Sequence, residues 1–161
     1  MFEVKAFKFH KTMTTEYQGH VTFVRESAVI SAPIDRVWAE LFGKMDFAWW
    51  SLVKAVSGDF HKVDGILSFD WKDGTKTTHR IVELSSTSKK IALELLTSEP
   101  AQPGVSAVVH TLQLRPITAT NETFFEWTSE FGAFELTEAV TQDSKYKKLE
   151  AFKDLAAAVK K

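Results

Sequence analysis

Near the end of the chain, from about Thr137 onward, apolar residues recur mostly at three- and four-residue spacing. Lysines fall largely between them, so the pattern predicts a long amphipathic helix with one apolar stripe and a solvated remainder. The apolar positions are Val140, Leu149, Phe152, Leu155, Ala156 and Val159. The lysines expected on the solvated side are Lys145, Lys147, Lys148, Lys153 and Lys160.

The part of the chain before this helix consists mostly of strand patterns, in which apolar and polar residues alternate. A short helical stripe at Ile34–Phe42 follows Pro33, a residue suited to the first position of a helix. A second short turn or helix is expected over Asp46–Val53. The strands are expected at Val21–Ile30, Ala55–Phe60, Gly65–Trp71, Lys76–Leu84, Lys90–Thr97, Val105–Leu114 and Glu122–Phe131.

Short connections between these strands predict an antiparallel meander. Asp73-Gly74 is a strong hairpin signal, because glycine tolerates the positive φ that tight turns require. A single long helix must bury its stripe, and a curved sheet is the only large surface available to it. We therefore predict an α+β helix-grip fold. In it, a curved antiparallel sheet of about six or seven strands wraps around the C-terminal helix, with two short helices after the first strand. Such a sheet tends to leave a cavity beneath the helix.

Composition narrows the classes of function. The 161 residues include 20 basic and 21 acidic side chains without a long run of like charge, which argues against nucleic-acid or anionic membrane partners. The absence of cysteine excludes disulfides and thiolate chemistry and favours a cytoplasmic location. We expect no signal peptide, and no apolar stretch approaches the ~20 residues that span a bilayer. The 13 Phe and 5 Trp favour an interior in which some rings line a cavity.

Residues 1–18 form a separate N-terminal extension in this interpretation. Apolar alternation begins at Phe2 and slips by one residue at Phe7. The extension is either an extra edge strand or a segment ordered only by docking onto the domain formed by residues 19–161.

The order of a strand, two short helices, six strands and a long helix resembles that of the START/Bet v 1-like (SRPBCC) superfamily. The local segments that carry the resemblance are Ser31–Trp38, Phe47–Val53, Asp73-Gly74 with His79–Leu84, and Phe125–Phe131. The last two of these resemble the polyketide cyclase-like branch. The resemblance covers residues 20–160 and implies an internal pocket for a hydrophobic ligand.

Two other branches are disfavoured by loop sequences. The plant pathogenesis-related branch carries a glycine-rich loop near His61–Gly65, where this chain has a single glycine. The gate and latch sequences of the plant hormone receptors are also missing, and Pro100–Gly104 occupies one of the loops that would carry them.

His79 and His110 lie in predicted neighbouring strands, and the resemblance implies that both point toward the cavity. An imidazole there could bind a ligand or act as an acid or base, because its ordinary pKa is close to neutral pH. A buried imidazole with satisfied hydrogen bonds is the alternative. The remaining histidines lack metal-ligand spacing, so we expect neither a metal site nor a cofactor.

The last predicted strand has two competing faces. Phe125, Trp127 and Phe131 alternate with polar residues that include Glu126. Binary patterning turns the rings inward and leaves Glu126 in water. The resemblance implies the opposite for Glu126, which would make it an acidic ligand contact. A one-residue shift exchanges the two faces, so only one of these arrangements can hold. Patterning is favoured slightly, and Glu126 stays a catalytic candidate beside the two histidines.

Large apolar side chains complete the candidate pocket. The resemblance places Phe47, Trp49 and Trp50 beside the cavity entrance, with core packing as the alternative. On the C-terminal helix, Tyr146 would form the back wall together with two apolar neighbours. The full set of candidate ligand-binding residues is Phe47, Trp50, Trp71, His79, His110, Leu112, Trp127, Leu149 and Phe152.

Three functions follow from these observations. The first is the binding of a small hydrophobic ligand, such as a lipid, sterol or aromatic metabolite, in an internal cavity. The alternative is a polyketide cyclase-, aromatase- or dehydratase-like enzyme in which His79, His110 or Glu126 moves a proton. The third is a partner-binding module like the chaperone co-activator branch, for which the Trp49-Trp50 pair is the indication. Motifs of hydrolases, metalloproteases and nucleotide-binding proteins are missing.

Overall fold

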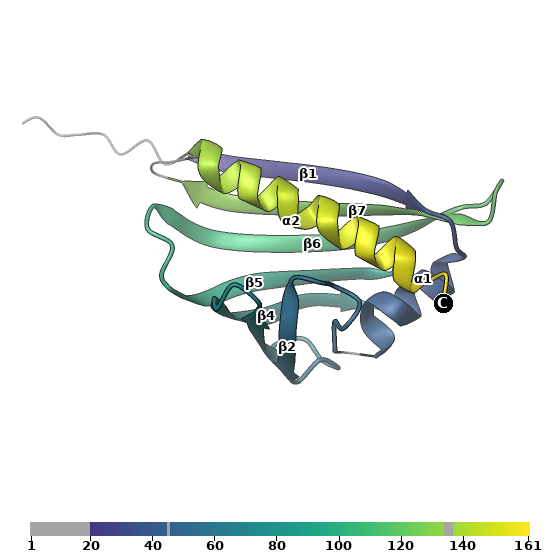
Figure 1. The fold of residues 1–161 in the computed structure, drawn as a ribbon, viewed down its shortest axis with the longest axis horizontal. Coiled ribbons are helices and arrows are strands. Elements are labelled where there is room, and N and C mark those ends of the chain that lie inside the picture. Colours follow the sequence, from purple (N-terminus) through teal and green to yellow (C-terminus); the bar gives the residue numbers. More distant parts are fainter. Residues whose placement is uncertain (1–19, 45, 134–136) are drawn as a thin grey trace, which may run out of the picture.

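The computed structural model of the protein describes residues 20–44, 46–133 and 137–161 (Figure 1). The predicted N-terminal extension, residues 1–18, lies outside them. The strands are β1 (His20–Ile30), β2 (Val53–Gly58), β3 (Ile66–Trp71), β4 (Lys76–Ser85), β5 (Lys90–Glu99), β6 (Val105–Ile117) and β7 (Glu122–Ala133). The helices are α1 (Ile34–Trp38), the π-helical turn η1 (Ala39–Gly43) and α2 (Thr137–Ala158).

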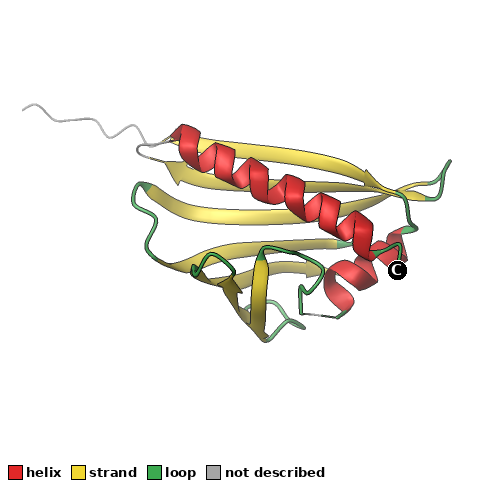
Figure 2. Ribbon diagram, in the orientation of Figure 1, coloured by secondary structure: helices red, strands yellow, loops and turns green. Residues whose placement is uncertain are grey.

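The described strands form one antiparallel sheet in the order β1-β7-β6-β5-β4-β3-β2. Strands β2 to β7 are neighbours in chain order, which is the predicted meander. Strand β1 forms one edge of the sheet beside β7. The pairing of these two strands runs from His20 opposite Ala133 to Ile30 opposite Thr123. The sheet curves, and α2 crosses its concave face (Figure 2). The predicted helix-grip architecture is therefore confirmed.

The hairpin between β3 and β4 also follows the sequence signal. Gly74 has a φ of 90°, and the carboxylate of Asp73 accepts a hydrogen bond of 2.8 Å from the backbone N–H of Thr75. A residue with a side chain adopts this φ only at a steric cost, whereas glycine does not. This turn brings the end of β3 and the start of β4 together at one edge of the cavity described below.

The segment after β1 differs from the prediction in one respect. Helix α1 continues directly into η1, but residues 46–52 form turns and not a second short helix. Phe47 has a φ of 50°, a value that lies outside the right-handed helical region. The helical pattern of large apolar residues here reflects ring packing, because Phe47, Trp49 and Trp50 are all buried.

The interior beneath α2 has a solid end and a hollow end. Under the C-terminal half of the helix, Phe152 and Leu155 belong to a large apolar cluster that also contains Val37 and Leu41. The ring of Phe152 packs edge-to-face on Phe125, with 4.8 Å between centroids. The N-terminal half of α2 instead faces a cavity. No helix in the described part of the chain is long and apolar enough to cross a membrane.

Candidate functional site

A cavity of about 130 Å³ lies between α2 and the concave face of the sheet. Most side chains on its walls are apolar or aromatic, and they include Phe69, Leu93 and Val108. The volume is close to that of an engineered cavity of ~150 Å³ that stays dry and binds benzene. The space is therefore of the right size for one aromatic ring.

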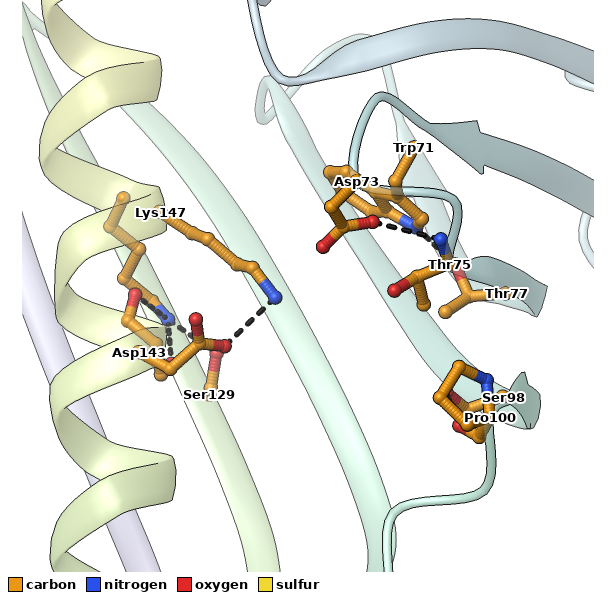
Figure 3. A network of polar contacts seen from close by, with 11 residues as sticks. Trp71, Asp73, Thr75, Thr77, Ser98, Pro100, Ser129, Asp143 and Lys147 are labelled. Carbon is orange, nitrogen blue, oxygen red and sulfur yellow. Dashed lines mark hydrogen bonds and ion pairs between the residues drawn. The ribbon is translucent and has the colours of Figure 1, made fainter.

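At one edge of the cavity, α2 faces the β3–β4 hairpin (Figure 3). Asp143 and Lys147 of α2 lie opposite Trp71 and Thr75 of the hairpin (Figure 3). The ammonium group of Lys147 pairs with Asp143 at 2.8 Å and lies 5.7 Å from the centroid of the Trp71 ring. The indole N–H of Trp71 donates to the hydroxyl of Thr77 at 2.9 Å, which fixes this ring at this edge of the cavity.

Three tryptophans form a connected aromatic wall. The ring of Trp50 meets Trp71 edge-to-face at 5.0 Å between centroids and meets Trp127 in the same manner at 5.2 Å. Edge-to-face contacts stabilise defined ring orientations, because the positive edge of one ring faces the negative face of the next. The segment at residues 46–52 thus supplies one side of the cavity through Phe47 and Trp50.

The inner end of the cavity holds a hydrogen-bonded group of polar side chains. Lys148 of α2 is only 2% exposed, and its ammonium donates to the hydroxyls of Ser129 on β7 and Ser144 on α2, each at 2.6 Å. Nδ1 of His110 on β6 lies 2.7 Å from the Ser129 hydroxyl. The ammonium can only donate, so the Ser129 hydroxyl accepts from Lys148 and links it to the imidazole of His110.

Burial sets the charge states of this group. It lowers the pKa of Lys148 to about 8, an effect that the nearby Glu26 and Asp143 oppose. Burial also lowers the pKa of His79 to about 4. The pKa of His110 lies well below its ordinary value because of burial, and the positive charge of Lys148 adds to the effect. At neutral pH both imidazoles are therefore uncharged, and Lys148 carries the positive charge of the inner end.

Several buried polar atoms on the cavity wall have no hydrogen-bond partner within the described part of the chain. They are the indole nitrogens of Trp50 and Trp127 and Nδ1 of His79. Buried polar side-chain atoms usually have a partner, so an unpaired group needs a reason. All three residues line the cavity.

Solved structures match this chain over most of its length. A Nitrosospira multiformis protein shares 24% identity at a TM-score of 0.73 and covers 84% of this chain and 94% of its own. Ara h 8.0201 shares 14% identity at a TM-score of 0.73, with coverages of 87% and 98%. XoxI from Bacillus cereus shares 16% identity at a TM-score of 0.73, with coverages of 86% and 95%. The chain has a Bet v 1-like fold.

At these identities the likeness shows the Bet v 1-like fold alone. A scan of protein-family models finds no match for this chain, and a search of curated proteins finds none either. The resemblance to the superfamily is thus supported at the level of the fold.

Within the Bet v 1-like fold, most of the candidate ligand-binding residues come together. Those that line the cavity are Phe47, Trp50, Trp71, His79, His110, Leu112 and Trp127. Phe152 is buried in the solid end and does not reach the cavity. Leu149 is 52% exposed and lies outside the lining, as does Tyr146, so neither forms the expected back wall.

Val140, Ser144 and Lys148 form the helical wall instead. Successive residues of an α-helix are about 100° apart, so a phase error of one position exchanges an inward for an outward side chain. Counting backward from the buried Phe152 places Lys148 one turn earlier on the same stripe. Lys148 was expected in solvent because it is charged, and the structure corrects that expectation.

Glu126 lies on the opposite face of the sheet from the cavity. It faces Arg25 at 3.5 Å and Arg115 at 3.6 Å, whereas Phe125 and Trp127 on the same strand are buried. The patterning argument is therefore confirmed, and Glu126 is not a candidate for chemistry in the cavity. Ser129, which the sequence analysis missed, lies on the inward face because it follows Trp127 by two residues.

The Trp49-Trp50 pair does not form an exposed docking surface. The two rings stack at 5.9 Å, and both are buried. The indole N–H of Trp49 donates to the carbonyl of Leu41 at 3.4 Å, so this residue belongs to the core between η1 and the sheet. The indication for a partner-binding module is thereby removed.

Proposed function

We propose that the chain binds a small, mainly apolar ligand with one aromatic ring in the cavity beneath α2, and that it does so in the cytoplasm. The observation that carries the proposal is a cavity of about 130 Å³ with aromatic and aliphatic walls in a Bet v 1-like fold. Rings from the sheet and from residues 46–52 supply the apolar surface, and the polar inner end supplies specificity. Such walls with a few convergent polar groups are typical of small-molecule sites.

The volume favours an aromatic metabolite over a lipid or sterol. A benzene-sized molecule suits a cavity of this volume, whereas a sterol needs several times more space. A side chain of the size of Phe buries roughly 200 Å². At about 25 cal/mol per Å², this area contributes roughly 5 kcal/mol before ordering costs. Apolar burial alone therefore limits the affinity to a Kd no tighter than roughly 0.2 mM.

A matched pair of variants on α2 tests this proposal. Val140→Phe adds a ring to a residue that lines the cavity, whereas Leu149→Phe adds it at an exposed position outside the lining. Titration with benzyl alcohol, followed by tryptophan fluorescence, should show at least a tenfold loss of affinity for V140F and none for L149F. Equal affinities in the two variants, or no binding to the wild type at any attainable concentration, would contradict the proposal.

An acid/base enzyme of the polyketide cyclase-like kind is the second candidate. The observation in its favour is the hydrogen-bonded series from Lys148 through Ser129 to His110, because such a series can pass a proton to or from a bound substrate. His110→Gln discriminates the two functions. The apolar walls remain in this variant, so benzyl alcohol should still bind to either kind of protein. Only an enzyme should in addition lose turnover in a screen of aromatic and polyketide-like substrates.

A further inference from the structure

We infer that the cavity takes an aromatic ligand that carries one anionic oxygen group of the carboxylate kind, and that Lys148 recognises this group. The inference rests on the proposed binding function and deepens it by naming the chemical class of the ligand. Charge balance, unpaired donors and the shape of the cavity support it independently.

Charge balance is the first support. The ammonium of Lys148 is buried, and its hydrogen-bond partners are neutral oxygens of Ser129 and Ser144. No carboxylate of the described residues lies within 4 Å of it, although buried charges are usually paired. The two nearest acidic neighbours already have partners, since Glu26 faces Lys145 at 3.7 Å and Asp143 faces Lys147 at 2.8 Å. One buried positive charge is left without a counter-charge.

The unpaired donors are the second support. The indole N–H groups of Trp50 and Trp127 can only donate hydrogen bonds, and neither has an acceptor in the described part of the chain. The centroids of their rings are 5.2 Å apart, and the ammonium of Lys148 lies 5.6 Å from the centroid of the Trp127 ring. Both tryptophans and Lys148 thus line the same cavity. A carboxylate has two oxygens that accept such bonds, and charge-assisted bonds are stronger than neutral ones.

The division of the cavity is the third support. Lys148 and His110 bring buried polar groups to the wall, and the neighbouring Leu93, Leu112 and Val108 supply apolar surface. A ring with one polar substituent matches this division, because the ring can cover the apolar side chains while the substituent reaches Lys148. A neutral apolar ring would leave the buried ammonium uncompensated.

Two ligands of similar shape and different charge test the inference. Benzoate carries the anionic group, and benzyl alcohol is its neutral counterpart. The wild-type protein should bind benzoate at least tenfold more tightly at pH 7. Lys148→Met should remove this preference, whereas Lys153→Met, at an exposed position of the same helix, should retain it. Lys148→Gln serves the same purpose should the Met variant fail to fold, as judged by circular dichroism.

The outcomes separate the inference from the proposed function. Equal affinity of the wild type for the two ligands overturns the inference and leaves the binding function standing. A folded Lys148 variant that keeps the preference for benzoate also overturns it. Binding of neither ligand overturns both. The comparison of the two ligands on the wild-type protein decides the question on its own if both Lys148 variants are unfolded.

Discussion

At the scale of single residues, the buried amine of Lys148 sets the electrostatic character of the cavity. It is held by two serine hydroxyls and lies near the imidazole of His110, which is uncharged at neutral pH. An ammonium in such surroundings loses hydration without gaining an ion pair, so its charged form is disfavoured. The folded chain therefore carries the free-energy cost of burying this positive charge, and a bound anion would offset that cost.

This cost predicts a pH dependence of folding stability. The pKa of Lys148 is about 8 in the folded chain and returns to its ordinary value of 10.5 on unfolding. Between these values the unfolded chain binds more protons, so raising the pH favours the folded state. The free energy of unfolding should rise by up to roughly 3 kcal/mol across this window. Below about pH 8 both states are protonated and this contribution is constant.

Urea unfolding at several pH values measures the effect. Lys148→Met should lack the rise between pH 8 and 10.5, whereas Lys153→Met should follow the wild type. Both variants remove one lysine from α2, so the comparison cancels the general effect of net charge. A Lys148→Met protein with the same pH dependence as the wild type would show that this amine is not buried as described.

At the scale of elements, α2 carries two functions along one stripe. Its first half presents Val140 and Ser144 to the cavity, Lys148 lies at its middle, and its C-terminal half presents Phe152 and Leu155 to the solid core. The sequence predicted the helix, because apolar spacing is a local signal. It did not predict the burial of Lys148: this residue shares the stripe of Phe152, but Ser129, the partner that accommodates its charge, lies 19 residues away on β7.

The strands were predicted more closely than the site. Alternation along Glu122–Phe131 and the turn at Asp73-Gly74 are local signals, and the structure confirms both. Binary patterning also placed Glu126 on the correct face, against the resemblance. The segment at residues 46–52, expected as a second short turn or helix, forms turns, and its closely spaced large rings only resemble a helical stripe. Its path depends on contacts with distant tryptophans such as Trp127, which no local pattern reveals.

At the scale of the whole molecule, the Bet v 1-like fold divides its interior between stability and binding. The abundance of aromatic residues allowed either a filled interior or a hollow one, and the structure contains both. Rings of Phe125 and Phe152 fill the end near α1, while Trp50, Trp71 and Trp127 wall a cavity at the other end. The solid end supplies buried apolar area without occupying the site. This division explains how a small domain keeps a cavity.

The measurement that tests the central claim most directly is the location of a bound neutral ring by NMR. Intermolecular NOEs should connect the ring protons of benzyl alcohol with the methyl groups of Leu93 and Leu112, which line the cavity. Leu155, in the solid end, should show none. NOEs to the exposed Leu149 alone, or none at saturating ligand, would contradict the claim that the cavity beneath α2 is a binding site.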